Sequence, residues 1–272
     1  MSPSKTDHIP FFARPFVYIG SGIMLFVAEA GAMGIFLLHG FAYTLSSWRQ
    51  VPKVLRQLRI IGSGSFFLIA LIGLFTGMVL GLQLHYTLSQ FGAAGSLGAV
   101  LSLVLIRELA PVLTAIMLTG RAGSAMAAEL GVMRISQQID ALHVMDIPPM
   151  GYLVSPRITA SLIAFPLLTC IFTCIALFGG YLTGILMLGG NEGAYLARME
   201  GSVNWTDVSG CLAKAITFAI IVVGVCCYKG FFAHMRTDGR GPEAVSNATT
   251  SAVVLSCVLI LAADYVLTSF LL

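Results

Sequence analysis

Residues 107–157 read RELAPVLTAIMLTGRAGSAMAAELGVMRISQQIDALHVMDIPPMGYLVSPR, and this stretch decides how the chain is organised. It begins inside an apolar segment with the adjacent charges Arg107 and Glu108. It leaves that segment through small residues and is expected to form one polar helix over 127–145. Another apolar segment follows directly. A structured polar helix between two membrane-like segments is expected to contact something outside the membrane.

The composition predicts an all-α integral membrane protein. The 272 residues are 57% hydrophobic and only 10% charged, whereas soluble domains carry about 25% charged residues. One water-facing core cannot enclose so much apolar surface. No basic cluster interleaved with aromatic residues indicates nucleic-acid binding. The six cysteines lie within or beside apolar segments without the spacing of a zinc site.

Five segments are long and apolar enough to be transmembrane helices: 62–86, 96–120, 156–188, 208–229 and 246–271. The segment 11–48 is also apolar at its centre, but positive charges flank it on both sides. Because the positive-inside rule places both flanks in the cytoplasm, an interfacial helix is favoured over a sixth span. Within 62–86, glycines recur at 73, 77 and 81. They indicate either close approach of another helix or only the abundance of glycine in membrane helices.

The distribution of Lys and Arg predicts the topology. Six of the fifteen lie in residues 1–60, three in 121–157 and three in 229–240, against one in 189–207. The N-terminus is therefore expected in the cytoplasm and the C-terminus on the opposite side of the membrane.

Four ionisable residues are expected at membrane depth: Arg107, Glu108, Lys214 and Asp264. Each costs at least about 2.5–3.5 kcal/mol at the centre of a span. Neighbouring residues on a helix point about 100° apart, so Arg107 and Glu108 each need a partner on another helix. Because the four charges sum to zero, a buried network is feasible. It is either a structural lock between helices or a polar patch that lines or gates a pathway.

The polar helix at 127–145 is amphipathic, with apolar residues between polar ones. It is either a connector on the membrane surface or a coupling helix that enters a groove of a cytoplasmic partner. The chain lacks a G-x-x-x-x-G-K-[ST] phosphate loop, so ATP hydrolysis by this chain is not expected. No catalytic constellation is visible, and no cofactor is expected in this chain.

The sequence resembles the MlaE/YrbE permease family, the membrane subunit of lipid-transporting ABC systems that maintain outer-membrane lipid asymmetry. The resemblance is carried by GMVLGLQ at 77–83, the long stretch 102–142, SPR at 155–157, CLAKAITF at 211–218 and LAADYVLTSFLL at 261–272. It covers the chain from about residue 50 onward.

The resemblance implies a single permease domain over 1–272, five spans with an N-terminal interfacial helix, and a homodimer in the bacterial inner membrane. It also implies three partners: a cytoplasmic ABC ATPase dimer that holds ATP and Mg, a small STAS-domain protein, and a periplasmic hexamer of MCE-domain proteins. Phospholipid would occupy a cavity at the dimer interface. The C-terminus would then be periplasmic.

The resemblance also implies site residues. Those expected to bind or translocate lipid are Leu80, Gln83, Leu88, Phe91, Glu108, Lys214, Asp264 and, at head groups, Arg14. Arg107 or Lys214 can supply a positive charge for the head group. Those expected to couple to the ATPase are Glu129, Gly131, Arg134, Gln137 and Asp140. An alternative function is an ion-coupled secondary carrier that uses the intramembrane charges, although no inverted repeat supports it.

Overall fold

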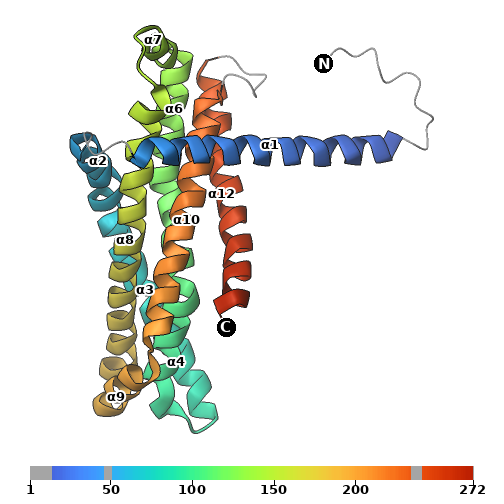
Figure 1. Cartoon of the computed structure of the whole chain (residues 1–272). Coiled ribbons are helices and arrows are strands. Elements are labelled where there is room, and N and C mark those ends of the chain that lie inside the picture. The colour runs from blue at the N-terminus through green and yellow to red at the C-terminus, as the bar shows by residue number, and fades with distance from the viewer. Residues whose placement is uncertain (1–13, 46–50, 234–240, 272) are drawn as a thin grey trace.

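The computed structural model describes residues 14–45, 51–233 and 241–271, with backbone alone for 14–23, 25, 26, 45 and 271. These described residues form helices and no strand. Five helical segments are long and apolar enough to cross a membrane: Val51–Gln90, Ala94–Ile135, Met150–Met187, Trp205–Phe231 and Pro242–Phe270. They stand side by side as one bundle (Figure 1). The prediction of an all-α membrane protein with five spans is therefore confirmed.

Each span consists of one or more of the labelled helices. In chain order the helices from residue 51 onward are α2 (Val51–Leu58), α3 (Gly64–Gln90), α4 (Leu97–Val104), α5 (Ala110–Leu118), α6 (Ser124–Ile135), α7 (Gln138–Val144), α8 (Ser155–Tyr181), α9 (Glu192–Ser202), α10 (Trp205–Phe231) and α12 (Pro242–Leu271). Of these, α7 and α9 lie outside the spans. Widened π turns connect several of them within a span, at Arg59–Ser63, Leu105–Leu109 and Thr119–Gly123. Two further π turns, Met150–Val154 and Leu182–Met187, lie at the two ends of α8.

The glycine repeat on α3 packs against α8 of the same chain. A Cβ atom at Gly77 would overlap the backbone carbonyl of Ala176, and one at Gly73 would lie 3.2 Å from the carbonyl oxygen of Phe172. All three glycines of the repeat are buried. Their absent side chains let the two helix backbones approach closely, as small residues do between membrane helices. Of the two readings of this repeat, the structure supports close helix approach.

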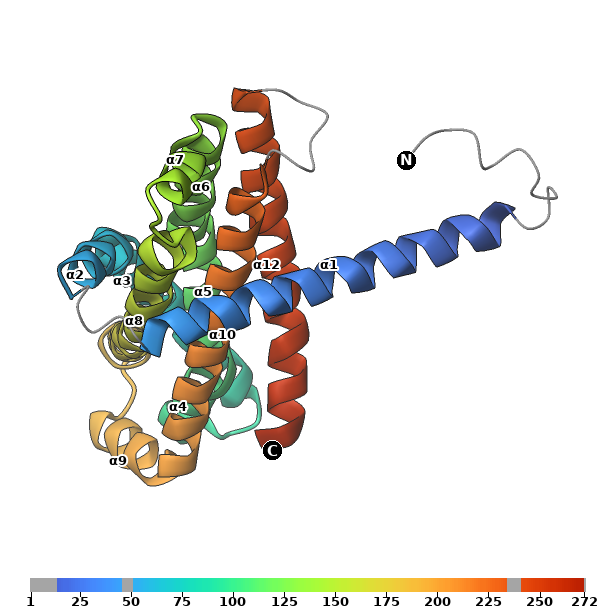
Figure 2. The same cartoon turned by 45° about the horizontal axis from the view of Figure 1, so that its top comes forward.

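The N-terminal helix α1 (Arg14–Leu45) runs across the bundle rather than along it, and its N-terminal part projects beyond the other helices (Figures 1 and 2). Its C-terminal part is attached to α10. Phe36 is buried against the rings of Tyr228 and Phe231, and the Glu29 carboxylate accepts a hydrogen bond from Lys229 Nζ at 2.6 Å. α1 therefore crosses the spans instead of lying parallel to them.

The polar segment 127–145 differs from the continuous helix expected from the sequence. Its first part is the end of α6, which continues the second span to Ile135. The helix then breaks at Gln137, whose φ of 58° is left-handed, and α7 begins at Gln138. A left-handed residue is a common way to end a helix. Here the Gln137 N–H donates to the Arg134 carbonyl at 3.2 Å, so the amphipathic pattern extends across two short helices.

Candidate functional site

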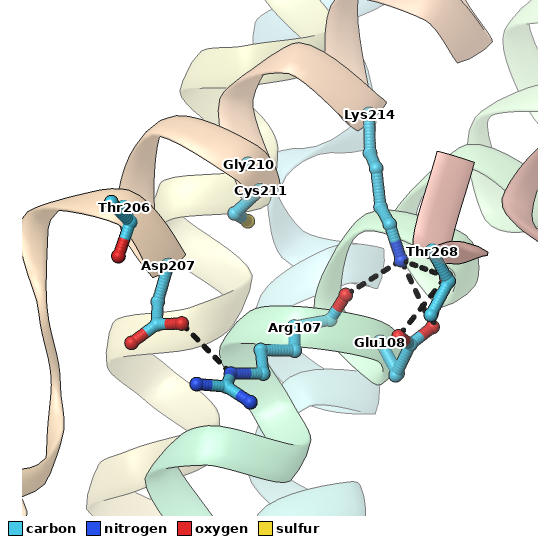
Figure 3. A pocket seen from close by; sticks show the side chains of 8 residues that line it. All are labelled: Arg107, Glu108, Thr206, Asp207, Gly210, Cys211, Lys214 and Thr268. Atoms are coloured by element: carbon cyan, nitrogen blue, oxygen red, sulfur yellow. Dashed lines mark hydrogen bonds and ion pairs between the residues drawn. The ribbon is translucent and has the colours of Figure 1, made fainter. Parts of the chain in front are cut away.

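Two of the charges expected at membrane depth, Glu108 and Asp264, pair with Lys214 on α10, whose side chain is only 2% exposed. Figure 3 shows Lys214 beside Glu108. Its Nζ atom lies 3.0 Å from Glu108 Oε2 and 2.9 Å from Asp264 Oδ1. The contact with Asp264 is an ion pair without hydrogen-bond geometry. Nζ also donates to Thr268 Oγ1 at 2.7 Å. The expected pairing between different helices is therefore confirmed.

The local backbone prepares a place for the Lys214 ammonium group. Pro111 has no N–H group, so it cannot bond the carbonyl of Arg107 four residues earlier. The π turn Leu105–Leu109 lies at the same point of the span. Lys214 Nζ donates to this Arg107 carbonyl at 2.8 Å. The proline thus leaves an acceptor that the lysine satisfies.

Arg107 points away from Lys214 and pairs with Asp207 at the start of α10 (Figure 3). Its Nε donates to Asp207 Oδ1 at 2.8 Å. The other carboxylate oxygen of Asp207 accepts from the Asn204 N–H at 3.0 Å and completes an N-terminal capping box. The Arg107 side chain is 42% exposed. Its remaining guanidinium nitrogens are therefore accessible to an anion.

These side chains line a cavity of about 270 Å³. Its lining residues are Arg107, Glu108, Thr206, Asp207, Gly210, Cys211, Lys214 and Thr268. Pockets for drug-sized ligands measure about 300–1,000 Å³. The cavity lies just below this range, so it suits a small polar group and not a whole phospholipid.

The comparison with protein families identifies the chain. A family model described as Permease MlaE matches residues 54–270. The chain belongs to the MlaE permease family. The match includes every residue that lines the charged cavity and begins after α1. Membership makes the chain the membrane component of a transporter.

Relatives of this MlaE-family permease cover nearly all of it. The intermembrane phospholipid transport system permease protein MlaE of Haemophilus influenzae is 34% identical over 254 residues, 93% of this chain and 95% of the relative. A probable ABC transporter permease protein of Rickettsia typhi is 39% identical over 246 residues, 89% and 93% of the two chains. The chloroplastic protein TRIGALACTOSYLDIACYLGLYCEROL 1 of Arabidopsis thaliana is 34% identical over 270 residues, 99% of this chain and 73% of the relative.

The other residues expected to contact lipid in this MlaE-family permease lie away from the charged cavity. Leu80 and Leu88 on α3 are partly buried and pack against the apolar core. Gln83 is exposed on α3, and Phe91 directly follows that helix with 79% exposure. None of the four lines the cavity. The Arg14 side chain lies outside the described residues.

Two residues expected to couple to an ATPase have internal partners. The Glu129 carboxylate accepts from Nη2 of the buried Arg157 at 2.6 Å, which connects α6 to α8. Gly131 is buried, and a Cβ there would lie 3.3 Å from the Val245 side chain of α12. Both residues therefore hold α6 against the bundle.

The other three lie at the break between α6 and α7. Arg134 Nη1 donates to Asp140 Oδ1 at 2.7 Å, and the Asp140 side chain is 55% exposed. Gln137, between them, is exposed. This surface, the Gln137 turn, stands at the end of the bundle opposite the C-terminus (Figure 1).

The sequence did not indicate Asp207, Thr268 or Arg157 as partners of the site. Asp207 lay at the end of a predicted outer loop, although Asn204 followed three residues later by an acid before an apolar run is a capping signature. Thr268 and Arg157 carry no such local signal, because their partners are distant in the sequence.

Proposed function

We propose that the chain is the permease subunit of an ABC transporter that moves phospholipids between the inner and outer membranes and so maintains outer-membrane lipid asymmetry. The observation that carries this proposal is the match along nearly the whole chain to a relative named for intermembrane phospholipid transport. The charged cavity supports it, because Arg107 offers guanidinium nitrogens that suit a phosphate.

ATP is bound and hydrolysed, in this proposal, by a separate dimer of cytoplasmic ATPase subunits that holds ATP and Mg. The permease itself is not an enzyme and holds no cofactor. The missing phosphate loop supports this division of work. The Gln137 turn is the docking point, because its exposed polar groups lie at one end of the bundle.

Two copies of the permease enclose the lipid at their interface. The apolar faces of α3 and α12 support this arrangement, since large side chains remain exposed on both: Val79 is 55% exposed, Val258 58% and Tyr265 78%. Lipid tails would contact the outer end of α3, near Leu80, Gln83, Leu88 and Phe91, and Arg14 would meet head groups.

The transporter lies in the bacterial inner membrane with the N-terminus cytoplasmic and the C-terminus periplasmic. The bias of Lys and Arg supports this orientation. A small STAS-domain protein joins the ATPase on the cytoplasmic side. A hexamer of MCE-domain proteins receives or delivers lipid on the periplasmic side, which is the side of the charged cavity at the start of α10 and the end of α12.

A charge reversal at the docking point tests the proposal. Asp140→Lys breaks the ion pair with Arg134 and makes the neutral Gln137 turn positive. We therefore expect less ATPase to co-purify and less ATP-dependent lipid transfer between vesicles. Glu200→Lys is the matched control, because Glu200 is exposed on α9 at the opposite end of the bundle. Unchanged ATPase recovery in Asp140→Lys contradicts the docking role.

The same vesicles distinguish an ion-coupled carrier. The buried network of Glu108, Lys214 and Asp264 is the feature that such a carrier would use. Transport driven by an ion gradient without ATP would refute the proposed ABC function. Transport that needs ATP and ignores the gradient supports it.

A further inference from the structure

A second cavity lies on the outside of the bundle, between the start of the first span and α8. It measures about 480 Å³ and is mostly apolar. One wall comes from α2, the π turn Arg59–Ser63 and the start of α3, and the other from α8. The lining residues are Leu55, Leu58, Arg59, Gly62, Ser63, Phe66, Ala164, Leu167, Leu168 and Ile171. We call it the Arg59 groove.

The Arg59 groove is open to the outside of the chain. A Cβ atom at Gly62 would meet no atom within 4 Å, so the space beside this lining residue is open. Leu55 and Leu167 are each 57% exposed on the two walls, and Phe66 is 48% exposed. Apolar side chains that border such an open groove need an apolar occupant.

The depth of the groove places its occupant in the membrane. Arg59 is the last charged residue before an uncharged run that extends through residue 106. An arginine at such a boundary keeps its guanidinium at the level of lipid head groups. The α8 wall extends from Ala164 to Ile171, about 10 Å along a helix, so it covers part of one leaflet of a hydrocarbon core about 30 Å thick.

The charge of the groove specifies the head group. Arg59 is the one charged residue among the described residues that line it, and no acidic side chain accompanies it there. The Ser63 hydroxyl donates its hydrogen bond to the Arg59 carbonyl oxygen at 2.8 Å. The phosphate of a lipid head group can therefore pair with Arg59. A head group that also carries an ammonium group has no carboxylate in the lining to pair with.

We propose that the Arg59 groove binds one phospholipid of the cytoplasmic leaflet, with an acyl chain between α2 and α8 and an anionic head group at Arg59. This site is separate from the Arg107 cavity, which lies at the other end of the bundle. It requires only that the chain be inserted in a membrane. The bound lipid fills the space between two helices and acts as a fixed part of the permease surface.

Fluorescence quenching tests this site in the full chain. Trp48 and Trp205 are replaced by Phe in every variant, and a single reporter is introduced as Phe66→Trp in the groove wall. The chain is reconstituted in phosphatidylcholine vesicles that contain brominated phosphatidylglycerol, which quenches tryptophan on contact. Parallel vesicles carry brominated phosphatidylcholine. The ratio of the two association constants measures the preference for the anionic lipid.

The reference reporter is Phe67→Trp, because Phe67 is 76% exposed at nearly the same depth but does not line the groove. We expect about a fivefold anionic preference at position 66, the effect of one arginine near anionic lipid, and a ratio near one at position 67. Arg59→Gln should remove the preference at position 66. Arg56→Gln, an exposed cation outside the lining, should retain it.

Two results would overturn the proposal. Equal preferences at the two reporters, or a preference that survives Arg59→Gln, would show only general attraction of anionic lipid to the positive end of the bundle. Weak quenching by both brominated lipids at position 66, with normal quenching at position 67, would show that protein covers the groove. Because no ATP or transport is involved, either result leaves the proposed transport function untouched.

Discussion

Replacing Lys214 by methionine tests how much the buried charge network contributes to the fold. The substitution keeps the length of an unbranched side chain but removes the ammonium group. The Arg107 carbonyl, Glu108 and Asp264 then lose their shared partner. Removing one member of a buried ion pair costs about 3–5 kcal/mol, because the remaining charge stays buried without compensation.

The structure places Lys214→Met at the lower end of that range. The Glu108 side chain is 39% exposed toward the cavity and keeps part of its hydration. The Asp264 side chain is 18% exposed and carries most of the penalty. We therefore expect the free energy of unfolding to fall by about 3 kcal/mol.

Equilibrium unfolding of the full chain in mixed detergent micelles, followed by loss of helicity, measures this difference. A decrease below about 1 kcal/mol would refute the reasoning, because that is the contribution of a fully exposed ion pair. Expression level and lipid transport are measured on the same variant. Transport that falls further than expression indicates that the charges handle lipid, and equal losses favour a lock.

A neutral version of the network separates these two roles. Lys214→Met combined with Glu108→Gln and Asp264→Asn leaves no unpaired charge, so most of the unfolding free energy should return. If the charges only lock the helices together, transport returns with stability. If they act on the lipid head group, stability returns and transport does not.

Three further changes follow from the packing. Glu129→Ala leaves the buried guanidinium of Arg157 without its carboxylate, so the free energy of unfolding should fall by about 3–5 kcal/mol. This free energy should recover when Arg157→Met is added, and a failure to recover would contradict the pairing. Gly77→Ala forces α3 away from the backbone carbonyl of Ala176 on α8, and the protein should lose about 1–3 kcal/mol of stability in thermal melts. Gly62→Ala is the control and should not destabilise the protein, because the space beside Gly62 is open. Equal effects of the two substitutions would refute the close contact. Burial raises the pKa of Tyr195 to about 12 from 10.0. The contribution of the buried neutral phenol to stability is therefore complete below pH 10 and is lost as the pH rises toward 12. Phenolate absorbance, compared with that of Tyr195→Phe, measures this pKa, and ionisation of Tyr195 near pH 10 would contradict the prediction.

The spans were predictable because the physical signal is strong. Long uncharged runs are stable in lipid as helices, because every backbone polar group is then paired within the segment, and the described part of the chain contains five such helices. The intramembrane charges stood out for the same reason, since each is costly where it lies. Their zero net charge made a network feasible, but the partner of Arg107, Asp207, came from a segment that the sequence placed outside the span.

The break within 127–145 was not predictable from the pattern of apolar residues. Gln137 adopts a left-handed φ that glycine or asparagine usually supplies, so no residue type marked the turn. The π turns were not predictable either, because each inserts one residue into a helix without changing the composition of the segment. The family resemblance gave Glu129 a coupling role, but its ion pair with Arg157, 28 residues away in sequence, left no local signal.

The second span joins the charged cavity to the Gln137 turn as one helical segment, Ala94–Ile135. From Glu108 to Arg134 it covers about 39 Å at the rise of an α-helix. The π turn Thr119–Gly123 interrupts this path, and such turns are where helices bend. Arg121 in that turn donates to Ser65 Oγ of α3 at 2.7 Å. Arg121 therefore fixes the second span to α3, the helix that carries Leu80 and Gln83, at a point between the Gln137 turn and Glu108.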